Sequence, residues 1–222
     1  MEAFEQLHAW IARPEAAADV ENAWQRIGDA YETVSRELPP SRAMIRRELS
    51  FHSHVKLLGY LCPLVNGLQG DVVEIGVWKG KSLSFMASLA RAEKQIIGID
   101  PLELPNQKSE LTFFLERICP RAVILQGYSE LSITALLPLT TRIALLHIDG
   151  GHLARNVILD FLLYAPFVVA GGYVVFDDYR DVRHSPEVGP AVDLLRAGGL
   201  FQGFDIIGPV EGYASSYVLK KR

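Results

Sequence analysis

From residue 71 onward, short β-rich runs alternate with helix-length segments, and no other feature constrains the fold more. The expected strands cover 71–77, 95–100, 122–127, 143–149 and 172–178, and each is followed by an expected helix, at 81–91, 108–118, 129–137, 153–165 and 187–197. Such units form a parallel sheet with helices on both faces. Two more strands, 204–209 and 215–221, close the chain. We therefore expect a doubly wound α/β fold with a seven-stranded, mostly parallel sheet and one antiparallel strand at its end.

The first 69 residues contain no convincing strand and are expected to form helices at 4–11, about 20–38 and 48–68. The second helix carries an apolar stripe that steps by three and four residues: Val20, Trp24, Ile27, Tyr31, Val34 and Leu38. Packing against the chain's own body is the favoured interpretation of this stripe, and a dimer seam is the alternative. We divide the chain into an N-terminal helical extension, 1–69, that supplies a lid or oligomer contacts, and an α/β domain, 70–222.

Composition narrows the classes of partner. A formal charge of −4 and a pI near 5.9 argue against nucleic acid or an anionic membrane. The two cysteines, Cys62 and Cys119, have no paired spacing, which favours a reducing compartment and no zinc or redox motif. The N-terminus lacks the pattern of a secretory signal, and the longest uncharged stretch, 161–176, is too short to span a membrane. We expect a cytoplasmic protein whose partner is a small molecule.

The first strand runs into a glycine-containing turn, where doubly wound folds bind ligands. Gly76 and Gly80 allow a tight turn and close approach to a ligand, and Ser82 is placed to cap the next helix. The spacing is neither the G-x-G-x-x-G of dinucleotide sites nor a P-loop. Glu74, pointing into this turn, would repel a pyrophosphate and attract a cation such as the sulfonium of S-adenosylmethionine. A turn without any ligand is the alternative.

Polar residues also follow the second and third strands. Asp100, some twenty residues after the glycine turn, is placed to accept hydrogen bonds from ribose hydroxyls, with a turn or cap role as the alternative. Ser129 either caps the next helix or touches the edge of an adenine ring, and the sequence favours neither.

Three carboxylates follow the fourth and fifth strands, which are neighbours in such a fold. Asp149, Asp177 and Asp178 converge without any lysine or arginine in the two strand ends. Crowded carboxylates raise one another's pKa values unless a cation compensates them. Oxygen-only ligands favour magnesium or a similar hard divalent cation over zinc. Loop and helix caps are the alternative.

His152 follows Asp149 at the start of the next helix and is a candidate general base for a hydroxyl proton. His184, in the loop after Asp178, is a secondary candidate. The other histidines are expected at the surface or in packing: His8, His52, His54 and His147.

The segment from Gly70 to about Leu195 resembles class I S-adenosylmethionine-dependent methyltransferases. It is most similar to the macrocin O-methyltransferase group, which methylates sugar hydroxyls of macrolides and related natural products. The matching stretches are GDVVEIGVWKGKS (70–82), GID (98–100), HIDGGH (147–152) and GGYVVFDDY (171–179).

This resemblance implies the strand order 3-2-1-4-5-7-6 and makes 70–222 the methyltransferase domain. It implies cofactor contacts near Glu74, Gly76, Ser82 and Asp100, to which we add Gly80, Ser129 and Asp149. It implies magnesium on Asp149, Asp177 and Asp178, with His152 as the base. Some relatives carry an acidic residue at the position of Gly151, so the base assignment rests here on His152 alone.

The expected function is metal-dependent O-methylation of a small-molecule hydroxyl, in a sugar or vicinal diol of a natural product such as an antibiotic. A catechol-type phenol is the alternative acceptor, and the chain is expected to form a homo-oligomer. An NAD-dependent oxidoreductase is disfavoured by the absent G-x-G-x-x-G. A non-catalytic binding domain is disfavoured because it has no need for clustered acids.

Overall fold

The computed structural model describes residues 2–38 and 55–222 and contains one seven-stranded sheet in the order β3-β2-β1-β4-β5-β7-β6. The strands are β1 (Asp71–Ile75), β2 (Ile96–Asp100), β3 (Ala122–Gln126), β4 (Ile143–Ile148), β5 (Val168–Phe176), β6 (Phe204–Val210) and β7 (Tyr213–Lys221). The first five pair in parallel, and β7 is antiparallel to β5 and β6. The predicted fold class and strand order are confirmed.

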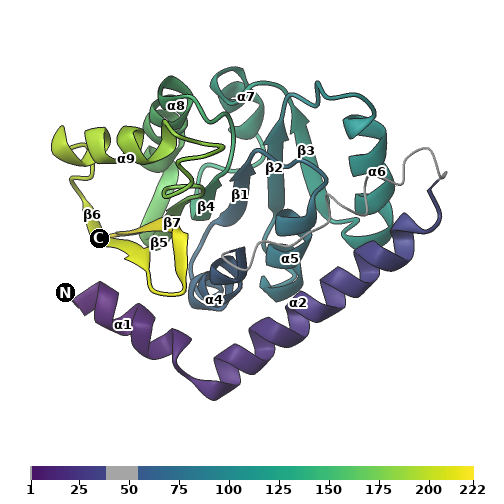
Figure 1. Cartoon of the computed structure of the whole chain (residues 1–222), viewed down its shortest axis with the longest axis horizontal. Coiled ribbons are helices and arrows are strands. Elements are labelled where there is room, and N and C mark those ends of the chain that lie inside the picture. Colours follow the sequence, from purple (N-terminus) through teal and green to yellow (C-terminus); the bar gives the residue numbers. More distant parts are fainter. Residues whose placement is uncertain (1, 39–54) are drawn as a thin grey trace.

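Helices cover both faces of the sheet (Figure 1). They are α1 (Glu2–Ile11), α2 (Pro14–Ser35), α4 (Lys56–Val65), α5 (Lys81–Leu89), α6 (Gln107–Ile118), α7 (Ser129–Leu136), α8 (Ala154–Tyr164), the short 3₁₀ helix η3 (Ala165–Phe167) and α9 (Val188–Ala197). Helices α7, α8 and α9 share one apolar core with the sheet, and α4, α5 and α6 share the other. None of the helices in 2–38 and 55–222 combines the length and apolarity that a membrane crossing requires.

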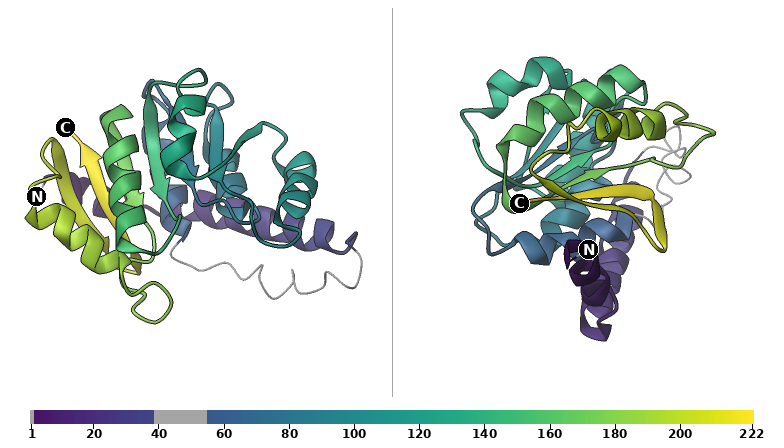
Figure 2. Two further views of the ribbon diagram at one scale, coloured as in Figure 1. Left: turned by 90° about the horizontal axis from the view of Figure 1, so that it is seen from above. Right: turned by 90° about the vertical axis from the view of Figure 1, so that its left-hand side faces the viewer.

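The N-terminal helix α2 forms an outer layer beyond α4, α5 and α6 (Figure 2). Its apolar stripe is buried there, because Val20, Ile27 and Tyr31 pack with Phe85 and Phe114 of the same chain. The favoured interpretation of this stripe, packing on the chain's own body, therefore accounts for it, and a dimer seam is not needed. Of the predicted helix 48–68, residues 48–54 lie outside the described part; α4 covers 56–65, so the helix ends three residues earlier than predicted.

Strand β5 differs most from its expected range, since it begins at Val168 and not at 172. The pair Gly171-Gly172 therefore lies inside the strand, with Gly171 at φ +82°. A Cβ on Gly172 would lie 2.8 Å from the carbonyl oxygen of Ala144. The pair therefore lets β5 run close beside β4 through an irregularity in the register between Ile143 and Leu145.

Backbone hydrogen bonds continue past the last strand residues and hold the strand ends together. The N–H of Gly76 donates to Ile99 at 2.9 Å, and that of Asp149 donates to Ile75 at 2.8 Å. The N–H of Asp177 likewise donates to the carbonyl of Ile148 at 3.0 Å. The residues that were expected to carry chemistry are thus fixed by the sheet, although the strands themselves end one residue earlier.

Candidate active site

The carboxyl ends of β1 to β5 open on one cavity of about 1090 Å³. Most of the predicted site residues line it: Gly76, Ser82, Asp100, Ser129, Asp149, His152, Asp177 and Asp178. Glu74 and Gly80 are not among the described residues of its lining. The sheet therefore gathers most of the predicted site, from five different strand ends, in a single place.

The two glycines of the turn after β1 serve different purposes. Gly76 lines the cavity at φ +83°, and a Cβ there would lie 1.9 Å from the carbonyl oxygen of Asp149. Gly80, at φ +78°, faces Leu111 and Leu115 of α6. Its position therefore does not support the predicted contact with a ligand. Gly80 is also the N-cap of α5, and no side chain caps that helix, so the predicted cap by Ser82 is wrong.

Asp100 organises the glycine turn through both of its carboxylate oxygens. Oδ2 accepts hydrogen bonds from the backbone N–H groups of Val77 and Trp78, at 2.9 and 3.1 Å. Oδ1 accepts from the N–H of Leu102 and from Nε2 of Gln107, at 2.7 and 3.0 Å. A carboxylate offers about four positions for accepting hydrogen bonds, and these four donors occupy them. Asp100 still lines the cavity, and its contact with a ribose stays a prediction.

Glu74 does not point into the glycine turn, contrary to the prediction. It is completely buried, and its Oε1 lies 2.9 Å from Nδ1 of His147, which is 1% exposed. The reason is strand alternation: Val73 and Ile75 pack on one face, so Glu74 must lie on the other, where the register pairs it with His147. Its Oε2 has no hydrogen-bond partner among residues 2–38 and 55–222.

His147 is buried, in line with the packing role expected of it, and it also lies in a possible ligand group that the sequence did not indicate. Its ring joins Asp149 and Asp177 in a group whose ligand atoms lie within 4.8 Å of one another. A second such group contains Asp149, His152 and Asp178. The signal was present in the sequence, since His147 lies two residues before Asp149, which directly follows β4, and strand alternation puts both side chains on one face.

The predicted metal set, Asp149, Asp177 and Asp178, is therefore divided between two groups, of which Asp149 is the shared member. Asp177 is 7% exposed and continues the buried face of β5. Asp178 has φ +55°, and its side chain belongs to a different group from that of Asp177. Each group also contains a histidine, so a nitrogen ligand is available beside the oxygen ligands that the sequence predicted.

The charge balance around Asp149 fits a bound cation. Burial raises the pKa of this carboxyl well above its ordinary value, and the charges of Asp177 and Glu74 raise it further. A metal ion would relieve both the burial cost and the repulsion. The cavity also contains Lys81 of α5, which was not singled out in the sequence, and burial lowers the pKa of its ammonium to about 8.

His152 is held by a residue that the sequence analysis missed. The Oγ of Ser185, in the loop after β5, lies 3.0 Å from Nδ1 of His152 and 2.6 Å from Oδ2 of Asp178. The other ring nitrogen, Nε2, lies 3.4 Å from the same Oδ2. Ser185 is 1% exposed, so the three side chains form a fixed cluster at the edge of the cavity. No motif marked this serine, because only the fold brings it to His152.

Ser129 does not cap α7, which was one of its two predicted roles. It is the first residue of α7, a helix without a side-chain cap, and its hydroxyl donates to Oδ1 of the buried Asp160. Ser129 lines the cavity, so contact with an adenine stays a prediction. Burial raises the pKa of Asp160 to about 6, and this effect outweighs the opposite effect of the Ser129 hydroxyl.

Asp160→Asn should therefore stabilise the protein in a pH-dependent way. The folded chain binds this proton more tightly than the unfolded chain, so the contribution of Asp160 to stability is lost as pH rises from 3.8 to about 6. Asparagine avoids that loss, and the variant should gain up to about 3 kcal/mol in free energy of unfolding at pH 8. Urea unfolding at pH 5 and pH 8 measures it, with Asp205→Asn at a half-exposed site as control. An equal effect at both pH values contradicts the assignment.

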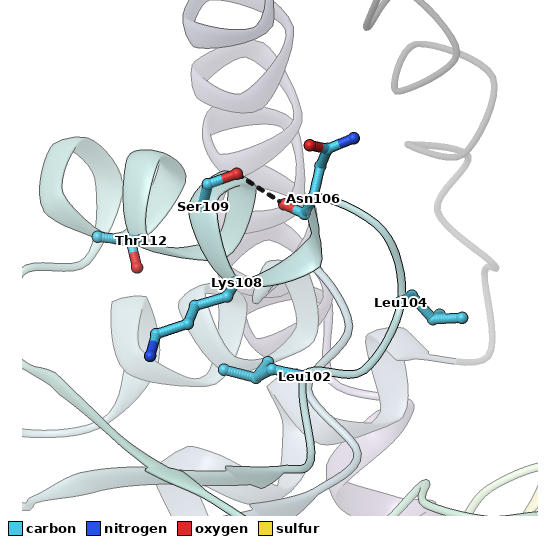
Figure 3. Close-up of a pocket in the computed structure, with 6 residues that line it drawn as sticks. All are labelled: Leu102, Leu104, Asn106, Lys108, Ser109 and Thr112. Atoms are coloured by element: carbon cyan, nitrogen blue, oxygen red, sulfur yellow. Dashed lines mark hydrogen bonds between the residues drawn. The ribbon is translucent and has the colours of Figure 1, made fainter.

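A separate hollow of about 600 Å³ lies over the start of α6 (Figure 3). Its described lining consists of Leu102, Leu104, Asn106, Lys108, Ser109 and Thr112. None of these six is a carboxylate or a histidine, so the hollow has no group suited to acid–base chemistry. Leu104 also lines the large cavity, which remains the candidate active site.

Comparison with known proteins agrees with this location. The model of a methyltransferase domain family matches residues 73–179, which contain the glycine turn, Asp100 and the acidic strand ends. A relative from Acanthamoeba polyphaga mimivirus, an uncharacterised protein, is 38% identical over 153 residues. The alignment spans 67% of this chain and 69% of the viral protein.

Solved structures share the fold at low sequence identity. CalS11, a TDP-rhamnose 3'-O-methyltransferase of calicheamicin biosynthesis, superposes with a TM-score of 0.57 at 20% identity, over 90% of this chain and 93% of its own. The O-methyltransferase NovP gives 0.62 at 19% identity, over 91% and 99%. TomG of Streptomyces achromogenes, solved with S-adenosylmethionine, gives 0.60 at 16% identity, over 90% and 89%.

Proposed function

This chain contains a methyltransferase domain over residues 73–179 and belongs to one family with the mimivirus protein, and on that premise we propose that it transfers a methyl group from S-adenosylmethionine to a small-molecule hydroxyl. The observation that carries the proposal is the convergence of the glycine turn and three acidic residues on one cavity. A donor above the turn and an acceptor above the acids would then lie side by side. Holding two reactants in this way removes much of the entropic cost of their encounter.

The donor side of the cavity suits a cationic ligand with an aromatic ring. Two exposed aromatic side chains, Trp78 and Tyr128, line it, and each offers a face for stacking. Bound S-adenosylmethionine supplies an electrophilic methyl carbon and carries a sulfonium charge. The carboxylate of Asp149 beside the glycine turn favours that charge, and the buried Glu74 adds a negative field from below.

The acceptor side of the cavity suits a hard divalent cation. Asp149, Asp177 and Asp178 would hold it, with Asp149 central because it belongs to both ligand groups. When bound, such an ion supplies Lewis acidity that makes a hydroxyl oxygen easier to deprotonate. His152 lines the same cavity with its side chain 47% exposed, so that it accepts the proton of the acceptor hydroxyl.

We propose a sugar or another vicinal diol of a natural product as the acceptor, in a macrocin-like reaction. The two ligand groups around Asp149 suit two neighbouring oxygens, which a diol presents. CalS11 is described as acting on TDP-rhamnose, and NovP and TomG as O-methyltransferases, which supports an oxygen acceptor. A catechol presents a similar pair of oxygens and is the second candidate.

Metal removal tests the proposed reaction. In excess chelator, methyl transfer to a panel of glycosides and catechols should fall to background, because the acidic cluster loses the ion that compensates its charge. Binding of S-adenosylhomocysteine, measured by calorimetry, should remain within about twofold, since the donor rests on the glycine turn. Added magnesium should restore turnover.

Two outcomes count against the proposal. Full activity in chelator would remove the metal from the reaction. Stabilisation of the protein by NAD and not by S-adenosylhomocysteine, in a thermal-shift comparison, would replace the methyltransferase by an oxidoreductase.

A further inference from the structure

The buried hydroxyl of Ser185 bridges two site residues that lie on different elements. His152 precedes α8, whereas Asp178 follows β5, and Ser185 touches both. A serine hydroxyl has one proton, and an ionised carboxylate can only accept a hydrogen bond. At 2.6 Å from Oδ2 of Asp178, the Ser185 hydroxyl must therefore donate its proton to that oxygen.

The direction of the second hydrogen bond follows from the first. Because the only proton of Ser185 is used on Asp178, its oxygen accepts a hydrogen bond from His152 at 3.0 Å. Nδ1 of His152 must then carry a hydrogen. In a neutral imidazole this leaves the lone pair on Nε2. Nε2 lies 3.4 Å from Oδ2 of Asp178, and both residues line the cavity.

We infer that Ser185 is a positioning residue that holds His152 in its Nδ1–H tautomer and leaves Nε2 as the proton-accepting atom. The reaction that Nε2 would serve is the proposed methyl transfer, and to that extent the inference rests on it. A fixed tautomer matters because a base with its proton on the wrong nitrogen cannot accept one from the substrate. Ser185 itself does not touch the reacting atoms.

Backbone hydrogen bonds around Asp178 fix the position of Ser185 relative to this carboxylate. Asp178 has φ +55°, a conformation that costs energy for a residue other than glycine. The N–H of Tyr179 donates to Ser215 at 2.7 Å, and the N–H of Asp181 donates to Asp178 at 3.0 Å. The N–H of Ser185 in turn donates to Asp181 at 3.0 Å, which fixes the serine relative to the acid that it contacts.

The tautomer of His152 can be observed directly by long-range ¹H–¹⁵N NMR of the labelled protein, recorded over a pH series so that the spectrum of the neutral ring is identified. The spectrum of His152→Ala assigns the ring signals. We expect a protonated Nδ1 and an unprotonated Nε2 in the wild type and in Ser185→Thr, which keeps the hydroxyl. In Ser185→Ala we expect the signals to move toward the Nε2–H tautomer.

Kinetics supply the second readout. Ser185→Ala should lower kcat by about 10- to 100-fold, while KM for S-adenosylmethionine stays unchanged. Ser185→Thr should recover most of this loss. The control is Ser35→Ala, which removes the hydroxyl of another buried serine, bonded to the carbonyl of Glu32 and absent from the cavity lining, and should change neither readout.

An Nε2–H tautomer in the wild type, or the same tautomer in Ser185→Ala as in the wild type, overturns the inference. The NMR measurement needs no turnover. A chain that shows the expected tautomer but transfers no methyl group would therefore contradict the proposed function and leave the role of Ser185 standing.

Discussion

Asp149→Asn should abolish methyl transfer, with a fall of at least about 10³-fold in kcat/KM. Asp149 belongs to both of the ligand groups found among residues 2–38 and 55–222, so its loss weakens either arrangement of the cation. Lewis-acid stabilisation is worth several kcal/mol, and about 1.4 kcal/mol corresponds to a factor of ten in rate. Steady-state kinetics with excess magnesium measure the loss.

The same variant should lose the effect of magnesium on stability. In the wild type, magnesium at about a hundred times its Kd should raise Tm by about 5 °C or more, because it binds only the folded chain. Asp149→Asn should show no such rise. The control is Asp71→Asn, the same type of substitution at the end of β1 that lies away from the cavity, and this variant should retain the rise in Tm. A wild-type rise that survives in Asp149→Asn would contradict the ligand role.

His152→Ala should lower kcat by about 10²- to 10⁴-fold, the usual contribution of a general base. The affinity for S-adenosylhomocysteine should stay within about twofold, because the glycine turn and Asp100 remain intact. Added imidazole should restore part of the rate, since the side chain is about half exposed and its place opens on the cavity. Kinetics and calorimetry on one preparation measure both quantities.

His152→Ala also tests whether His152 is a base or a metal ligand. His152 lies in one of the two ligand groups, so it is a base or a metal ligand. If His152 is a base, His152→Ala should keep the magnesium-induced rise in Tm. Loss of that rise in His152→Ala would make it a ligand, and unchanged turnover would place the base elsewhere. His8→Ala, in α1, is the control for removal of a histidine outside the cavity.

The sequence predicted the sheet and the place of the site because both follow from periodicity. Strands that alternate with helices leave few possible topologies, and the residues after each strand must then meet at one edge. The positions of Asp149, Asp177 and His152 along the cavity therefore needed no knowledge of packing. The boundary of β5 was missed because Gly171-Gly172 indicates a turn in isolation and acquires its role only beside β4.

Side-chain direction could be predicted only in part. Strand alternation would have placed Glu74 and His147 on the same face of the sheet, opposite Val73 and Leu146, and the register of β1 and β4 then makes them neighbours. Two other features depend on contacts between segments that are distant in the sequence. Gly80 faces α6, and both carboxylate oxygens of Asp100 accept hydrogen bonds. Ser185 belongs to the same class, because its partner His152 lies 33 residues away.

The N-terminal helix α2 also has a role that its pattern did not reveal. Besides burying its stripe, it reaches the glycine turn, because the hydroxyl of Tyr31 donates to the carbonyl of Lys79 at 2.9 Å. The same ring stacks on Phe114 with 4.8 Å between centroids. The helix therefore supports the turn from outside the sheet. A periodicity argument shows that such a stripe is buried, and it does not show what the stripe supports.

The most direct test is a crystal structure of the chain grown with S-adenosylhomocysteine and manganese, with anomalous diffraction used to locate the metal. We predict the nucleoside over the turn that contains Gly76, and a manganese peak within about 2.5 Å of an Asp149 oxygen. The thioether sulfur should face the metal across the cavity. A ligand bound elsewhere, or a cavity in which manganese avoids Asp149 altogether, would contradict the account.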